Sequence, residues 1–191
     1  MRHLVFLLEE PSARDLLEHV VPRIVPAPDV SASYLVFEGK SDLEKGMTTK
    51  MRAWRRPNSG FVVLRDQDAG DCRKVRQKLF DLAEASQQAL FTVRVACREL
   101  ESWILGDWTA VARAFDKPAL EAQSRKATYK NPDLLSNPVE ELRKHIPTYQ
   151  KRDGARRVGA HLDLARNCSP SFRAFCTGVQ KLVNAIGTTA S

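Results

Sequence analysis

An alternation of short apolar runs and amphipathic segments in the first half of the chain constrains the fold more than any other feature. Four runs have the length and composition of buried strands: His3–Leu8, Tyr34–Phe37, Phe61–Leu64 and Phe91–Ala96. Between them apolar residues recur at helical spacing. Ser12 can cap the first of these helices and Ser41 the second, and Gly70 or Asp71 opens the third, with Asp71 as its expected cap. The resulting order of elements is β-α-β-α-β-α-β.

That order predicts an α/β fold, with a mostly parallel four-stranded sheet and helices on both of its faces. After about Ala96 the strand signals stop, and helical spacing continues through residues 99–105, 108–115, 138–145, 154–165 and 171–186. We therefore expect an α/β core over residues 1–105 and an all-helical, basic extension packed on it over residues 106–186. Residues 187–191 are expected to be a frayed tail.

The composition is that of a soluble folded protein, with 43% hydrophobic and 28% charged residues in 191. No apolar run approaches the roughly 20 residues needed to span a bilayer. Glu9 and Glu10 end the first apolar run too early for a signal peptide. We expect a cytoplasmic protein with no membrane partner.

Charge is distributed unevenly along the chain. Residues 1–116 contain 17 Lys and Arg against 17 Asp and Glu, whereas residues 117–191 contain 13 against 6. A basic second half favours a polyanionic partner, with nucleic acid as the first candidate. A solvated helical surface that is rich in Lys and Arg explains the charge equally well.

Acidic residues follow three of the four predicted strands. Glu9 and Glu10 come after the first, Asp66 and Asp68 after the third, and Glu99 and Glu101 after the fourth. In a parallel sheet these positions share one edge, which is where ligands bind in such folds. Each group alone has an ordinary explanation, since Asp favours turns and Glu favours the first turn of a helix.

Taken together, the six carboxylates predict a divalent metal site. Clustered carboxylates repel one another and are costly to bury, so folds avoid them unless a cation compensates. Oxygen ligands suit Mg²⁺ or Mn²⁺. The spacing leaves open whether Glu9 or Glu10, and whether Glu99 or Glu101, is the working group.

At these residues the sequence resembles the TOPRIM fold, which topoisomerases, primases and a class of defence nucleases share. Glu9 falls on the family's glutamate after the first strand, and Asp66 and Asp68 fall on its Asp-x-Asp. The glycine that usually follows the glutamate is Glu10 here. The resemblance implies that these carboxylates hold Mg²⁺ for phosphodiester chemistry.

Several longer stretches are similar to a family of bacterial TOPRIM-like proteins without an assigned activity. They are Leu8–Ala13, Phe37–Lys40, Leu64–Asp68, Arg98–Trp103 and Tyr149–Arg156. The resemblance spans most of the chain. It implies a link with a partner ATPase of the AAA or ABC type, in mobile-element or phage defence.

The resemblance also implies roles for single residues. Glu9, Asp66 and Asp68 would hold one or two Mg²⁺, and Glu99 or Glu101 would complete the metal shell or act as a base. Lys40 and Lys151 are candidates for a fixed cation that positions the phosphate. The run of Lys151, Arg152, Arg156 and Arg157 would track a nucleic-acid backbone, or would simply be a solvated helix start.

The leading hypothesis is a metal-dependent nuclease or nuclease subunit. The sequence does not separate DNA from RNA, and we favour DNA. The alternative is a non-catalytic, degenerate TOPRIM module that binds nucleic acid or a partner ATPase. A phosphohydrolase for small phosphate esters is a third possibility, which the basic second half disfavours because such an enzyme needs no polyanion surface.

Overall fold

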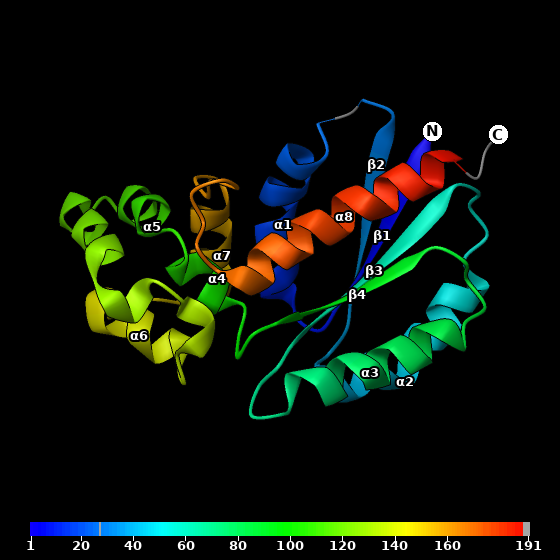
Figure 1. Cartoon of the computed structure of the whole chain (residues 1–191), viewed down its shortest axis with the longest axis horizontal. Helices are drawn as coiled ribbons and strands as arrows, with labels where there is room; N and C mark the ends of the chain where they lie inside the picture. The colour runs from blue at the N-terminus through cyan, green and yellow to red at the C-terminus, as the bar shows by residue number, and fades with distance from the viewer. Residues whose placement is uncertain (27, 189–191) are drawn as a thin grey trace.

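Four parallel strands form one sheet in the order β2-β1-β3-β4. The computed structural model describes residues 1–26 and 28–188 (Figure 1). The strands are β1 (Arg2–Leu8), β2 (Val30–Val36), β3 (Ser59–Asp66) and β4 (Phe91–Ala96). Leu8 pairs with both Val36 and Leu64, so the carboxyl ends of the strands lie nearly level.

Helices connect the strands and make up the second half of the described chain. The α-helices are α1 (Pro11–Ile24), α2 (Lys40–Ala53), α3 (Cys72–Glu84), α4 (Glu101–Leu105), α5 (Trp108–Ala114), α6 (Pro138–His145), α7 (Lys151–Gly159) and α8 (Pro170–Thr188). Three 3-10 helices lie between α5 and α6: η1 (Pro118–Arg125), η2 (Ala127–Tyr129) and η3 (Pro132–Leu134). Within the described residues, no helix combines the length and apolar character needed to cross a bilayer.

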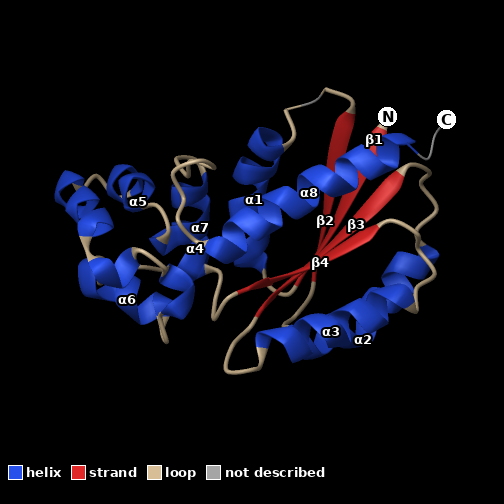
Figure 2. Cartoon of the chain, in the orientation of Figure 1, coloured by secondary structure: helices blue, strands red, loops and turns tan. Residues whose placement is uncertain are grey.

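Alternate residues of β1 feed two hydrophobic clusters on opposite faces of the sheet. Leu4 and Phe6 join the cluster that includes the apolar residues of α1 and α8. Val5 and Leu7 join the cluster built with α2 and α3. Because side chains alternate along a strand, a continuous apolar run is stable only when both faces are covered. Both faces are covered here, which confirms the predicted fold class (Figure 2).

Helix α8, the last helix of the described chain, lies against β3 and β4 (Figure 1). Phe172 and Phe175 of α8 pack on Trp103 of α4, with ring centroids 5.4 and 4.9 Å apart. One face of the sheet is thus covered in part by α8, although the expected domain boundary at residue 105 assigns this helix to the extension. That division of the chain stays a prediction.

Helix α7 joins the helical part to the core by packing along α1. A Cβ added at Gly159 would lie 3.1 Å from the backbone oxygen of Leu16, so the two helices approach closely at that point. Arg152 adds an ion pair to Asp15 of α1, with Nε 2.7 Å from Oδ2. These contacts fix the position of the first turn of α7.

Two of the expected helix caps are wrong. Helix α1 begins one residue before Ser12, because Pro11 occupies its first position and Glu10 is the N-cap. Helix α2 has Gly39 as its N-cap rather than Ser41, with a φ of 91° that favours glycine. For α3 the expected cap at Asp71 is confirmed, since its side chain accepts from the N–H groups of Arg73 and Lys74.

The C-terminal half differs more from the prediction. Helix α7 covers Lys151–Gly159 instead of 154–165, because the Asp163 carboxylate accepts from the N–H groups of Ala165 and Arg166 and forms a turn there. The 3-10 segments were not expected. Of the tail predicted at 187–191, the first two residues belong to α8 and residues 189–191 lie outside the described part.

The close approach of α7 and α1 gives a first prediction. Gly159→Val should lower the free energy of unfolding by about 1–3 kcal/mol, because the new side chain would press on the α1 backbone. Gly187→Val is the matched control, since the nearest atoms to a Cβ there are 3.9 Å away. Urea denaturation of both variants measures the difference, and equal stabilities would show that α7 does not pack tightly on α1.

Candidate functional site

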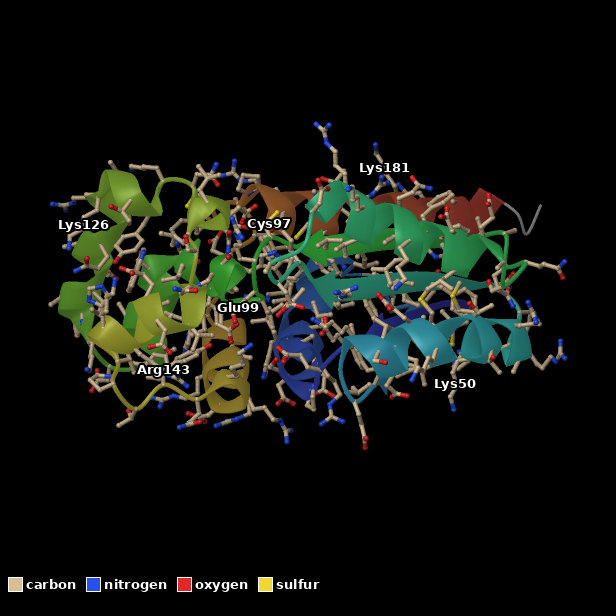
Figure 3. The ribbon with its side chains drawn as sticks, turned by 90° about the horizontal axis from the view of Figure 1, so that it is seen from below. Lys50, Cys97, Glu99, Lys126, Arg143 and Lys181 are labelled. Atoms are coloured by element: carbon tan, nitrogen blue, oxygen red, sulfur yellow. The ribbon has the colours of Figure 1, made fainter. Side chains whose placement is uncertain are left out.

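The strand register places the acidic residues at one edge of the sheet. Leu8 is paired with Leu64, and Asp66 is paired with Ala96, so Glu9 and Glu10 continue β1 at the level where β3 ends. Ligands bind at this carboxyl edge in open parallel sheets. Figure 3 shows Glu99 at the same place, where the helical part meets the core.

Arg65 organises the first group of carboxylates. It is only 7% exposed, and its Nη1 lies 2.7 Å from Glu44 Oε1. Its other nitrogens lie 3.7 Å from Glu9 Oε2 and 3.8 Å from Asp68 Oδ2. Lys40 adds a second cation, with Nζ 3.2 Å from Asp68 Oδ2. Two of the expected metal ligands therefore already face cations of the chain.

Lys151, at the start of α7, organises the second group. Its Nζ lies 3.8 Å from Glu10 Oε1, 3.7 Å from Glu99 Oε1 and 3.7 Å from Glu101 Oε2. The three carboxylates come from the end of β1, from the segment after β4 and from the first turn of α4. A single ammonium thus offsets the repulsion among three acids.

Asp66 lies between the two groups. Its backbone N–H donates to Glu9 Oε2 at 3.1 Å, and its side chain is buried. Burial raises the pKa of Asp66 well above its ordinary value, and Glu10 and Glu101 raise it further, although Lys151 opposes them. The site therefore favours a proton on Asp66 whenever no additional cation is present.

Glu101 is fully buried, and one of its two carboxylate oxygens has no hydrogen-bond partner. Tyr149 donates its hydroxyl to Glu101 Oε1 at 3.3 Å, while Oε2 accepts no hydrogen bond. Burial raises the pKa of Glu101 to about 7, against the pull of Lys151. Burial and the nearby Glu101 carboxylate also raise the pKa of Tyr149, so its phenol remains a donor.

Lys151 and Glu9 respond to the same surroundings. Burial alone would lower the pKa of Lys151, but Glu101, Glu10 and Asp66 raise it above its ordinary value. Burial raises the pKa of Glu9, and the hydrogen bond from the Asp66 backbone only partly offsets this effect. Lys151 is therefore charged at neutral pH. Glu9 holds its proton to a higher pH than an exposed glutamate does.

The loops after β3 and β4 are joined backbone to backbone beside the acids. Gln67 N donates to Ala96 O at 2.9 Å, and Asp68 N donates to Arg98 O at 2.8 Å. Asp68 and Arg98 have φ values of 57° and 62°. Left-handed backbone is uncommon for residues other than glycine and is concentrated at functional sites.

The structure thus brings together all six acidic residues predicted from the sequence, with Lys40 and Lys151 among them. The rest of the predicted basic run has internal partners. Arg152 pairs with Asp15, Arg156 lies 2.7 Å from Asp153 Oδ1, and Arg157 lies 4.4 Å above the Phe115 ring. Their role in binding nucleic acid stays a prediction.

Sequence reasoning missed two residues of the site. Arg65 lies in a stretch that carries the family resemblance, just after the expected strand Phe61–Leu64, and no role was predicted for it. A charged residue directly between an apolar run and Asp66 is a signal of a buried ion pair. Tyr149 belongs to a stretch that carried the family resemblance, but nothing in the sequence placed its hydroxyl beside Glu101. Tyr149 is 1% exposed and packs against Gly154, where a Cβ would clash with its ring.

The side chains as they stand do not form a ready metal site. Within the described residues, no three His, Cys, Asp or Glu side chains are placed to hold a metal ion together. The donor set nevertheless fits Mg²⁺ in kind, because it consists of carboxylate oxygens and includes the unsatisfied Oε2 of Glu101. Metal binding would require carboxylates to turn away from Arg65 and Lys151.

The fold has a counterpart among solved structures. The C-terminal region of the Burkholderia pseudomallei OLD protein matches with a TM-score of 0.55 and 20% sequence identity. The match covers 95% of this chain and 98% of that chain. At this identity the likeness shows the fold alone. No protein with a curated function matches the sequence.

The fold and the site together define an all-parallel α/β protein with a cluster of acidic side chains at the carboxyl edge of its sheet. The profile of a family described as a domain of unknown function, DUF4276, matches residues 8–180. The chain belongs to this family.

The raised pKa of Glu101 gives a second prediction. The group binds its proton more tightly when folded than at its ordinary pKa of 4.5, so it lowers stability as pH rises from about 4.5 to about 7. Glu101→Gln cannot ionise, so it should be more stable than the wild type by about 3 kcal/mol at pH 8 and nearly equal at pH 4.5.

Urea denaturation in EDTA at the two pH values measures this effect. Glu84→Gln, at an exposed position of α3, is the control and should not change the pH dependence. A stability difference between Glu101→Gln and the wild type that is the same at both pH values would contradict the raised pKa.

Proposed function

We propose that this protein is a divalent-metal-dependent nuclease, or nuclease subunit, of the TOPRIM type. It would hydrolyse phosphodiester bonds of nucleic acid with Mg²⁺ or Mn²⁺, and we favour DNA as the substrate. The observation that carries the proposal is that six carboxylates from three strand ends gather at one edge of the sheet, beside Arg65 and Lys151.

Glu9, Asp66 and Asp68 are the proposed metal ligands. They project from the ends of β1 and β3, and the Asp66 backbone already contacts Glu9. Glu10 or Glu99 would complete the shell. The raised pKa values of Glu9 and Asp66 agree with a site whose own cations compensate its acids only in part, since burial and nearby acids both disfavour the ionised forms.

A bound metal would lower the pKa of a water molecule and offset charge on the phosphate. Residues of the chain itself would position the phosphate and accept the proton. Lys151 is held at a fixed point by α7, where its ammonium can contact a non-bridging phosphate oxygen. Glu101 lies beside it and can accept a proton from the attacking water. Tyr149 holds Glu101 in place through its hydroxyl.

A non-catalytic module is the second candidate. It is favoured by one observation: within the described residues, the acids are paired with Arg65 and Lys151, and no three of them are placed to hold a metal. In this case the ion pairs would be purely structural. The protein would then bind nucleic acid or a partner protein without cutting.

We also propose that the protein works with a partner ATPase. The TOPRIM-like resemblance implies an ATPase of the AAA or ABC type. The likeness to the C-terminal region of the OLD protein extends over nearly all of both chains, and it supports only the fold on which this proposal is built.

Metal binding is the third prediction. Mg²⁺ at about 100 times its Kd should stabilise the wild type by about 2.7 kcal/mol. The double variant Asp66→Asn/Asp68→Asn should lose this stabilisation, because it removes two charged ligands while keeping their shape. Asp71→Asn is the control, since Asp71 caps α3 outside the site. Thermal unfolding with increasing Mg²⁺ measures it, and equal shifts in all three proteins would exclude these ligands.

Cleavage is the fourth prediction. With Mg²⁺ or Mn²⁺ the wild type should cut plasmid DNA, single-stranded DNA or RNA, and EDTA should stop it. Asp66→Asn/Asp68→Asn should reduce the rate by more than about 100-fold, since the loss of even an outer-shell partner of a metal ligand costs about 10–100-fold. Gel assays of the three substrates measure it. Salt-sensitive binding without cutting, unchanged in the double variant, would favour the non-catalytic module.

A further inference from the structure

An open cavity of about 380 Å³ lies directly beside the carboxylates. Three loops line it: the loop after β3, the loop after β4 and the segment before α6. Its lining residues are Asp68, Ala69, Arg98, Glu99, Ser136 and Asn137. Asp68 and Glu99 belong to both the cavity and the acidic site, so a ligand can occupy the two places at once.

Arg98 supplies the cavity with a cation that the fold does not use. Its backbone is fixed on both sides, since its N–H donates to Gln67 Oε1 at 3.1 Å and its oxygen accepts from Asp68 N at 2.8 Å. Its guanidinium has no acidic partner among the described residues. By contrast, Arg65 and Lys151 nearby are each surrounded by carboxylates.

The backbone at this point is held in an unfavourable conformation. Arg98 has a φ of 62° and faces Asp68 at 57° across their hydrogen bond. A residue other than glycine in this region costs on the order of 1 kcal/mol, and such strain persists where function requires it. Here it directs a charged side chain and an acidic ligand candidate to neighbouring positions.

The segment before α6 offers hydrogen-bond donors to the cavity, and an exposed apolar side chain lies close to them in the sequence. Asn137 is the N-cap of α6, but its side chain makes no capping bond, so its amide is available. Ser136 is exposed beside it. Two residues earlier, Leu134 is 75% exposed, which makes it one of two large hydrophobic side chains so exposed in the described chain, with Met1.

We propose that this cavity binds the phosphate next to the scissile one on a polynucleotide strand. Arg98 acts as a positioning residue that holds this second phosphate through its forked guanidinium. Ser136 and Asn137 donate to the same phosphodiester or its sugar, and Leu134 contacts the adjoining base. That the neighbouring phosphate is the one cleaved rests on the proposed nuclease function. The binding of a phosphate by Arg98 does not depend on that function.

This subsite selects for a chain of nucleotides over a small phosphate ester. A strand that crosses the edge of the sheet presents one phosphate to the carboxylates and the next to Arg98. An ester with a single phosphorus atom fills only the first position. The loss of Arg98 should therefore weaken the handling of polynucleotides and leave small diesters unaffected.

Binding is the first measurement. Fluorescence anisotropy of a labelled single-stranded oligonucleotide, in EDTA and at several salt concentrations, compares the wild type with Arg98→Ala and Arg55→Ala. Arg55 is an exposed arginine between α2 and β3, at the opposite edge of the sheet, so it is a control of equal charge. Arg98→Ala should weaken binding by about fivefold or more, and one lost phosphate contact should reduce the salt slope by about 0.7.

Cleavage is the second measurement. With Mg²⁺, Arg98→Ala should raise KM for the oligonucleotide about tenfold and leave kcat/KM for bis(p-nitrophenyl) phosphate unchanged. Arg98→Lys should recover part of the oligonucleotide affinity, because it keeps the charge and loses the fork. Equal losses on both substrates would overturn the proposal, since Arg98 would then act on the reacting phosphate or on folding.

The two proposals fail in different ways. An affinity and salt slope of Arg98→Ala equal to those of Arg55→Ala would overturn the subsite, whatever the cleavage result. A wild type that cuts neither substrate, yet binds the oligonucleotide through Arg98, would overturn the nuclease function and support the subsite.

Discussion

Repulsion among acids at the edge of a low-dielectric sheet is the constraint on which this structure depends. Lys151 faces three carboxylates from three different segments, and Arg65 faces three more. Arg65 is buried, and its loss would leave the acids that face it without compensating charge, at a cost of about 3–5 kcal/mol. The two cations therefore decide which conformations of the surrounding loops are stable. Burial and the neighbouring acids nevertheless raise the pKa values of Asp66 and Glu101, because Lys151 offsets these effects only in part.

The position of Lys151 depends in turn on the packing of the second half of the chain. Helix α7 is fixed on α1 by the close contact at Gly159 and by the Arg152–Asp15 ion pair. Helix α8 covers one face of the sheet and packs on Trp103, next to Glu101 in α4. The site thus lies at the junction of the core and the helical part (Figure 3). A change in either part is transmitted to the acids through packed backbone rather than through a flexible linker.

The same charge balance links stability with the proposed chemistry. Without metal, the chain's own cations share the carboxylates, and part of the negative charge is removed by protonation. A divalent cation would replace both forms of compensation and would leave Lys151 free to contact a phosphate. Arg98 differs from the other cations of this edge because it has no acid to neutralise within the described chain. Under the proposals, Lys151 would serve the reacting phosphate and Arg98 its neighbour.

The sequence by itself determined the four strands, the face that each apolar residue occupies, and the edge where Glu9, Asp66 and Glu101 meet. These follow from local periodicity and from the rule that parallel strands end together. Tertiary structure alone decided that Arg65 and Lys151 would pair with those acids, that Tyr149 would reach Glu101, and that Arg98 would remain unpaired. It also set the limits of α7, which an aspartate turn ends early. Such pairings join residues far apart in the chain, and their geometry depends on how helices pack rather than on any local pattern.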